Sequence, residues 1–311
     1  MIHMTLELAP SISVAKAFSP SHITGFYSEI KDDSILKHGS LGAGISISKG
    51  VTTEVELYRH EKNNFEININ GVISKDAIVS RYVINEFLKR SRKKYFVRVT
   101  HQTEVPIGYG MGTSGSAALS LSYALNHALS LGLSESESAQ IAHKAEIHCK
   151  TGLGTVLSEY YGGLCFRLKA GAPGIGKTSV LKINNYKVAI FCFSPIFTRY
   201  FIGSIGRISN HKCMNMMMKI LKTKDIVDFL DLSFDFSQSL KFLDKSCSSL
   251  IDLLAQNGFH SSAALFGQTV FTIVKENELE PIRKISKKFP ARLFISNIEN
   301  EGARLITKND T

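Results

Sequence analysis

The chain has 311 residues, 44% of them hydrophobic, and carries a formal net charge of +10 at neutral pH. This length and composition predict a globular protein of about two domains with ordinary buried cores. Apolar residues nowhere run together over about 18 positions, and the opening segment has no uninterrupted apolar run, which argues against a membrane span and a secretion signal. We therefore expect a cytoplasmic protein without a membrane partner.

Cysteine usage and charge narrow the class further. The five cysteines are widely spaced and form no CxxC pair, which favours reduced thiols over a disulfide framework or a zinc site. The basic excess favours anionic partners. Nucleic acid has its best support in KRSRKK at residues 89–94, but these residues end a predicted helix, where basic side chains also complement the dipole. We expect an anionic partner other than nucleic acid.

Hydrophobic periodicity predicts alternating helices and strands along the chain. Pro20 and Gly25 predict a loop over residues 19–27, after a first strand at 12–18. A glycine-rich turn is expected to open residues 38–58, which continue as a strand. Further strands are predicted at 65–70, 95–103, 187–193 and 291–295. Helices are predicted at 77–90, 135–149 and 278–287, with helical signals over 199–221 and two helical pieces over 226–255.

Residues 106–118, PIGYGMGTSGSAA, are the stretch around which the rest of the chain is organised. Gly108, Gly110 and Gly112 allow positive-φ turns and close approach of a ligand to the backbone. Thr113 and Ser114 are predicted N-cap residues for an apolar-periodic helix that reaches residue 128. Free N–H groups and the helix dipole would then hold an anion, most naturally a phosphate. A glycine-rich turn capping a buried helix is the alternative.

Residues 171–178, GAPGIGKT, satisfy the Walker A pattern letter for letter. That pattern requires a helix at its Lys-Thr pair, whereas the following residues read as two strands about an Asn-Asn turn. We interpret the segment as a surface loop joining strands.

Three separated segments resemble the GHMP kinases, a superfamily of small-molecule kinases. Residues 106–118 resemble their P-x-x-x-G-L-G-S-S-A-A phosphate loop, and residues 258–274 resemble their third segment, whose small residues here include Ser261, Ser262 and Gly267. Residues 19–26, SPSHITGF, and 39–44, GSLGAG, are similar to the archaeal pantoate kinase branch. The resemblance implies a two-domain α+β fold, with an N-terminal ribosomal S5 domain 2-like unit at 1–183 and a C-terminal ferredoxin-like unit at 184–311.

The resemblance also implies ATP and Mg²⁺ as cofactors. Glu146 matches the magnesium-ligating carboxylate of the family, with Ser114 as its companion ligand; a solvated glutamate is the alternative. The residues implied to bind the nucleotide phosphates are Pro106, Gly108, Gly110, Gly112, Thr113, Ser114, Gly115 and Ser116.

On the acceptor side, His22 takes the place of the family's lysine, and we expect it to be catalytic. Thr155 stands where pantoate kinases carry the aspartate assigned as general base, and a threonine hydroxyl has no useful basicity at neutral pH. Proton abstraction there would need Glu159 or another group, although phosphoryl transfer depends mainly on positioning and charge neutralisation. Substrate contacts are expected from Ser19, His22, Thr24, Ser40 and Lys150.

The implied activity is transfer of a phosphoryl group to the primary hydroxyl of a small anionic hydroxy acid. Pantoate is one candidate. Mevalonate 3-phosphate, phosphorylated on its 5-hydroxyl for isoprenoid biosynthesis, is favoured over it, because Thr155 removes a negative charge and the chain is basic. Lys16, Lys150 and Arg199 are then candidate partners of the extra phosphate. A third hypothesis is that the chain is a non-catalytic relative that only binds nucleotide. The sequence leaves the oligomeric state open, and a homodimer is one alternative.

Overall fold

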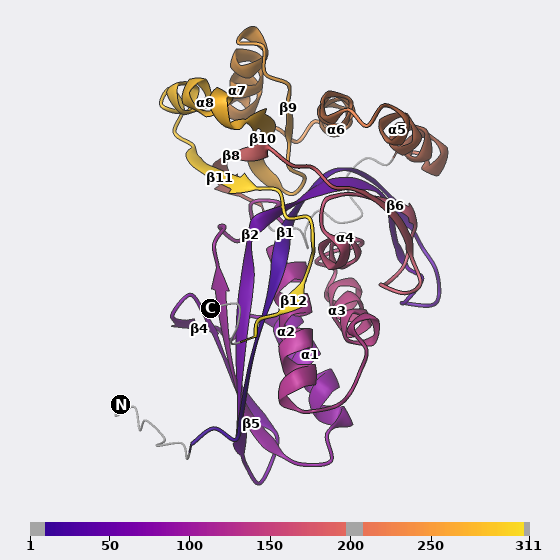
Figure 1. Ribbon diagram of the computed structural model, residues 1–311, viewed down its shortest axis with the longest axis vertical. Helices are drawn as coiled ribbons and strands as arrows, with labels where there is room; N and C mark the ends of the chain where they lie inside the picture. The colour runs from indigo at the N-terminus through magenta and orange to yellow at the C-terminus, as the bar shows by residue number, and fades with distance from the viewer. Residues whose placement is uncertain (1–9, 197–207, 308–311) are drawn as a thin grey trace.

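The computed structural model describes residues 10–196 and 208–307, which form two sheets covered by helices (Figure 1). The first sheet contains β1 (Ser13–Ile30), β2 (Gly39–Arg59), β3 (Asn64–Ile69), β4 (Val72–Ile73), β5 (Tyr95–Thr103), β6 (Leu164–Lys169), β7 (Lys177–Leu181) and β12 (Arg304–Leu305). The second contains β8 (Tyr186–Pro195), β9 (Ser261–Ala263), β10 (Gly267–Lys275) and β11 (Arg292–Asn297). The predicted α+β class is confirmed.

The first sheet has the strand order β12-β1-β2-β5-β3-β4, and β6 joins it by pairing with both β2 and β7. Its helices are α1 (Ile78–Arg90), α2 (Thr113–Ala128), α3 (Glu135–Cys149) and α4 (Thr155–Tyr161). Alternate apolar side chains of the strands, such as Val55 and Val97, are fully buried against helical residues such as Leu119 and Ala142. This core fixes the helix that follows the glycine-rich loop.

The second sheet has the order β11-β8-β10-β9, and each of these neighbouring pairs is antiparallel. Between β8 and β9 lie α5 (Asn210–Thr223), α6 (Ile226–Leu240) and α7 (Lys245–Gln256), and between β10 and β11 lie the 3-10 turn η2 (Glu276–Glu278) and α8 (Leu279–Ser286). Treating the helices before β9 as one crossover, this is the β-α-β-β-α-β order of ferredoxin-like units.

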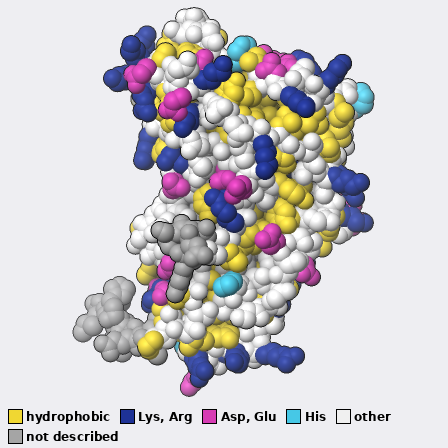
Figure 2. Space-filling model, viewed as in Figure 1, with side chains coloured by type: hydrophobic (Ala, Val, Ile, Leu, Met, Phe, Trp, Pro, Cys, Tyr) yellow, Lys and Arg dark blue, Asp and Glu magenta, His cyan; other side chains and the backbone are white. Residues whose placement is uncertain are grey.

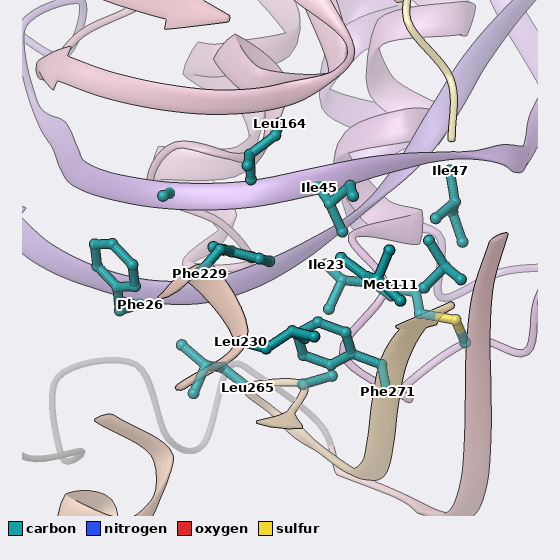
Figure 3. Close-up of a cluster of buried hydrophobic side chains, with 14 of the residues drawn as sticks. Ile23, Phe26, Ile45, Ile47, Met111, Leu164, Phe229, Leu230, Leu265 and Phe271 are labelled. Atoms are coloured by element: carbon teal, nitrogen blue, oxygen red, sulfur yellow. The ribbon is translucent and has the colours of Figure 1, made fainter. Parts of the chain in front are cut away.

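A shared hydrophobic core joins the two sheets. Figure 3 shows side chains from β1 and β2 facing side chains of α6 and β10. The labelled members are Ile23, Phe26, Ile45, Ile47, Met111, Leu164, Phe229, Leu230, Leu265 and Phe271. The chain crosses between the sheets at residues 182–185, and β12 returns to pair with β1. Because the last strand rejoins the first sheet, the division at 183/184 stays a prediction.

The loop predicted at residues 19–27 is wrong, because β1 continues to Ile30 in antiparallel register with β2. The two residues that interrupt the pattern, Pro20 and Gly25, fall at register shifts between Ser19 and Ser21 and between Thr24 and Phe26. Bulges leave one residue unpaired, so a proline without an N–H fits there. The glycine-rich turn predicted at residues 38–44 is likewise wrong, since β2 begins at Gly39.

Figure 2 shows the surface of the molecule from the same side as Figure 1. On this face, lysine and arginine side chains form separate small groups, with acidic and uncharged side chains between them. A continuous basic stripe would be expected of a nucleic-acid surface. Among the described residues, none of the helices is both long and apolar enough to cross a membrane.

A buried histidine under α2 makes stability depend on pH. The Nδ1 of His101 forms a hydrogen bond with Thr53 Oγ1 at 2.8 Å, and its Nε2 forms one with Ser80 Oγ at 3.0 Å. Burial lowers the pKa of His101 to about 4. The unfolded chain, with a histidine pKa of about 6.5, therefore binds more protons between these values, so the free energy of unfolding falls as pH falls from 6.5 to 4.

We expect this loss to reach about 3 kcal/mol for His101 alone, from about 1.4 kcal/mol for each pKa unit. Urea unfolding at a series of pH values measures it. His101→Gln should flatten the decline, whereas the exposed His60→Gln should leave it unchanged. Equal slopes in the wild type and His101→Gln would contradict this account.

Candidate active site

A cavity of about 560 Å³, part of it open to solvent, lies where the two sheets meet. Residues of β1, β2 and β6 form one wall, and the glycine-rich loop, residues 151–155 and the β9–β10 turn form the others. The polar and charged side chains that line the cavity are those of His22, Thr24, Ser40, Thr151, Thr155 and Arg167.

The glycine-rich loop has the backbone conformation predicted from its sequence. Gly108, Gly110 and Gly112 have φ angles of 89°, 74° and 67°, in the left-handed region that favours glycine. An added side chain at Gly110 would collide with the backbone of Leu265. Pro106 is half-buried where the loop begins. The loop is thus shaped by two constraints, its own turns and the neighbouring β9–β10 turn.

The predicted N-cap is wrong in detail. Gly112 is the N-cap of α2, and no side chain caps the helix, so Thr113 and Ser114 are its first helical residues. The sequence misled because serine and threonine usually cap helices with their oxygens. An uncapped helix start leaves backbone N–H groups directed at the loop, which is the arrangement that binds phosphate.

Glu146, near the end of α3, lies beside the start of α2. It is buried, and its Oε1 accepts hydrogen bonds from Ser114 Oγ and from Thr151 Oγ1, the latter at 2.7 Å. Burial raises its pKa, opposed by these two hydrogen bonds. Gly152 abuts Oε2, where an added side chain would collide. The carboxylate is therefore held through Oε1, and Gly152 leaves space beside its second oxygen.

One carboxylate and one hydroxyl, both oxygen donors, suit Mg²⁺, which binds few protein ligands and keeps several waters. The residues thus fit the metal that the family implies. No group of three or more metal-binding His, Cys, Asp or Glu side chains occurs within the described ranges.

Arg167, on β6, is a cation of the cavity lining and was not predicted. It is 1% exposed and donates to Ser158 Oγ at 2.8 Å, and its Nε has no hydrogen-bond partner among the described residues. Gly154 and Gly42 make room for it, since added side chains there would lie 2.7 Å from Nε and 2.9 Å from Nη2. A buried guanidinium with an unpaired N–H is costly unless an anion completes it. The cavity is therefore built for a negatively charged ligand.

His22 lines the same wall but is not a substitute cation for lysine. Burial, followed by the nearby charge of Arg167, holds the pKa of His22 well below its usual value, so its ring is neutral. Arg167 Nη1 lies 3.5 Å from Nε2, and arginine can only donate, so Nε2 is the acceptor and Nδ1 donates toward Ser46 Oγ at 3.3 Å. The imidazole orients the guanidinium.

The other residues predicted on the acceptor side divide into two groups. The predicted substrate contacts Thr24 and Ser40 line the cavity, as does Thr155, which was predicted to be catalytic and is the first residue of α4. Ser19 is buried outside the lining, with Oγ 3.4 Å from the Pro20 carbonyl. Lys150 is exposed in a left-handed conformation at the end of α3 and does not line the cavity.

Three further parts of the sequence interpretation fall at defined places in the structure. Gly267 abuts the backbone of Tyr109 in the glycine-rich loop, and its predicted approach to the phosphates stays a prediction. The next residue, Gln268, donates a hydrogen bond to the Phe242 carbonyl oxygen at 2.8 Å. Residues 171–176 form the turn between β6 and β7, so the Walker A match is a loop that joins strands. Arg199 lies outside the described residues.

Comparison with known proteins agrees with this geometry. Residues 77–163 match the family model described as the GHMP kinases N terminal domain. A pantoate kinase of Thermococcus kodakarensis is 30% identical over 294 residues, which cover 92% of this chain and 96% of the relative. A pantoate kinase of Methanocaldococcus jannaschii is 31% identical over 278 residues, which cover 87% and 96%.

Two solved structures show how widely the fold is shared. A phosphotransferase related to the CoA biosynthesis pathway superposes with a TM-score of 0.83 at 27% identity, covering 94% of this chain and 98% of its own. Mevalonate diphosphate decarboxylase from Enterococcus faecalis superposes with a TM-score of 0.73 at 15% identity, covering 95% and 99%. The second likeness shows the fold alone.

The glycine-rich loop and the matches over nearly the whole chain define the class of protein. The chain belongs to the GHMP kinases, which use ATP with Mg²⁺ to phosphorylate a hydroxyl group. Within that family it belongs to the archaeal pantoate kinase-like branch. The resemblance predicted from the sequence is confirmed at both levels.

Proposed function

We propose that this kinase transfers the γ-phosphoryl group of ATP to the primary hydroxyl of pantoate. The observation that carries the proposal is the charge of the cavity. Among its described lining residues, Arg167 is the sole cationic side chain, because His22 is neutral. One buried guanidinium with an unpaired N–H matches one carboxylate, which is the charge that pantoate carries.

The arrangement suggests a division of labour among the residues. Arg167 binds the carboxylate of the acceptor, and Thr24 and Ser40 contact its polar groups. The loop from Gly108 to Ser116 and the start of α2 hold the nucleotide phosphates. Ser114 and Glu146 would hold Mg²⁺, which neutralises charge on the phosphates when bound.

Thr155 borders the cavity where related pantoate kinases carry an aspartate. Its hydroxyl cannot take a proton at neutral pH. In a loose transition state the acceptor proton leaves late, so alignment of the hydroxyl and stabilisation of charge carry the reaction. We therefore assign Thr155 and His22 to positioning, Thr155 at the acceptor and His22 through Arg167.

Mevalonate 3-phosphate remains a second candidate, favoured by the loss of a negative charge at Thr155. It would bring a phosphate dianion in addition to a carboxylate. Of the three residues predicted to pair with that phosphate, Lys16 and Lys150 do not line the cavity, and Arg199 lies outside the described residues. Burying a second anion without a partner is costly, so the described cavity suits pantoate better.

A screen of ATP turnover decides between the candidates. We expect ADP release with pantoate and at most background release with mevalonate 3-phosphate, each at matched concentrations with Mg²⁺ present. Release with mevalonate 3-phosphate alone would reverse the assignment. Release with neither, together with ADP binding by calorimetry, would support the non-catalytic hypothesis.

A further inference from the structure

Glu159, on α4, is a buried carboxyl group that the proposed reaction does not use. It is fully buried beneath the start of α2 and the glycine-rich loop. Side chains added at Gly112 and Gly115 would lie 2.8 Å from Oε1 and 2.7 Å from Oε2. The carboxyl therefore lies directly behind the backbone that faces the nucleotide phosphates.

The hydrogen bonds of Ser116 determine the protonation state of this group. Ser116 Oγ lies 2.8 Å from the Pro20 carbonyl oxygen and 2.8 Å from Glu159 Oε1. A hydroxyl has one proton to donate, and a carbonyl oxygen can only accept. If Glu159 were ionised, it too could only accept, and one of these two close oxygen pairs would have no proton between them. Ser19 Oγ, at 3.4 Å, is too distant from the Pro20 carbonyl to replace Ser116.

A neutral carboxyl removes this conflict. Its O–H donates to Ser116 Oγ, and Ser116 donates to the Pro20 carbonyl, so the chain of hydrogen bonds runs from α4 through α2 to β1. The second oxygen, Oε2, has no hydrogen-bond partner in the described structure. That vacancy costs less for a neutral carbonyl oxygen than for an anionic one.

The charged groups around Glu159 act in the same direction. Burial raises its pKa well above the usual value, a hydrogen bond between Ser116 and an ionised carboxyl would oppose this, and the charge of Glu146 on α3 raises the pKa further. Three other segments pack against Glu159. On β1, His22 is neutral, and on β6, Arg167 donates its hydrogen bond to Ser158. In residues 299–303, Glu299 forms an ion pair with Arg304. Within residues 10–196 and 208–307, no cationic side chain forms a hydrogen bond or an ion pair with the Glu159 carboxyl.

We propose that Glu159 is a neutral carboxylic acid that donates a hydrogen bond to Ser116, and that it positions the glycine-rich loop for the nucleotide phosphates without adding negative charge behind them. An ionised group there would repel the triphosphate. Glu159 is a positioning residue, because it acts through Ser116 and the loop. The inference depends on the nucleotide site and is independent of which acid is the acceptor.

Infrared spectroscopy of protein with isotope-labelled glutamate tests the protonation state directly. At pH 7 we expect the C=O stretch of a protonated carboxyl group, which is resolved from that of carboxylates. The band should vanish in Glu159→Gln, shift in Ser116→Ala, and persist in Glu146→Gln, the control for the other buried glutamate. A spectrum without a protonated band assignable to Glu159 would overturn the proposal.

ADP binding without an acceptor tests the positioning role. Glu159→Leu removes the donor and should weaken ADP binding about tenfold, as expected for one lost buried hydrogen bond. Glu159→Gln keeps a donor and should recover most of that loss. Wild-type affinity should fall at high pH as the carboxyl ionises, while Glu159→Gln shows no such fall. Equal pH profiles for the two proteins would count against the role, and since pantoate is absent, the result does not depend on the proposed substrate.

Discussion

Replacing Arg167 by methionine is expected to raise the KM for pantoate about 30-fold or more, since removing one partner of a buried charge pair costs at least about 2 kcal/mol. Methionine roughly matches the aliphatic part of the arginine side chain and removes the guanidinium. If the carboxylate is bound equally in the ground state and the transition state, kcat stays near that of the wild type. Steady-state kinetics with pantoate as the varied substrate measures both constants.

Three comparisons make this result specific to the carboxylate. The KM for ATP should change little, because Arg167 lines the cavity on the side proposed to bind the acceptor, not in the glycine-rich loop proposed to hold the phosphates. The neutral amide of pantoate should be a poor substrate for the wild type, with little further loss in Arg167→Met. Arg98→Met, which removes a surface arginine paired with Glu56 and Glu66, is the matched control and should behave as the wild type. Equal losses for pantoate and its amide would exclude a carboxylate contact.

The sequence predicted the elements that have strong periodicity. The strand at 95–103 and the helix at 135–149 have the predicted bounds, because alternating and helical patterns are uninterrupted there. The extension of β1 beyond Phe18 was missed because Pro20 and Gly25 normally break strands. Pairing with the long strand β2, through two register shifts, outweighs that local preference.

The two sides of the candidate site differ in how well they could be predicted. The loop and Glu146 were predicted because glycine spacing and helix position are local features of the sequence. Arg167 was missed, since a single charge in LCFRLK gives no sign of whether its strand faces solvent or a cavity. Only the tertiary fold shows Gly42 and Gly154 leaving space for the guanidinium.

Lys150 illustrates the opposite error. Lys150 was predicted to contact the substrate and, with Lys16 and Arg199, to pair with the extra phosphate of mevalonate 3-phosphate. The chain reverses there in a left-handed conformation, which leaves the side chain exposed outside the cavity lining while Thr151 turns back to Glu146. Side-chain direction after a helix end depends on backbone angles that the sequence pattern does not specify.

Glu146→Gln is expected to reduce Mg²⁺-dependent turnover about 1,000-fold or more, because metal stabilisation of charge in the transition state is worth several kcal/mol. Glutamine keeps an oxygen that can accept from Ser114 and Thr151, so the change removes the negative charge and little else.

Two measurements separate loss of the metal from loss of the fold. ADP release as a function of Mg²⁺ concentration gives the catalytic effect, and Mn²⁺ binding followed by electron paramagnetic resonance in the presence of ADP gives the affinity for a metal without turnover. Glu135→Gln, at the exposed start of the same helix, is the matched control and should retain both. Turnover by Glu146→Gln with the Mg²⁺ dependence of the wild type would show that this carboxylate is not a ligand. Because α3 and α2 pack together through a largely apolar core, a folded but inactive Glu146→Gln would locate the defect at the carboxylate itself.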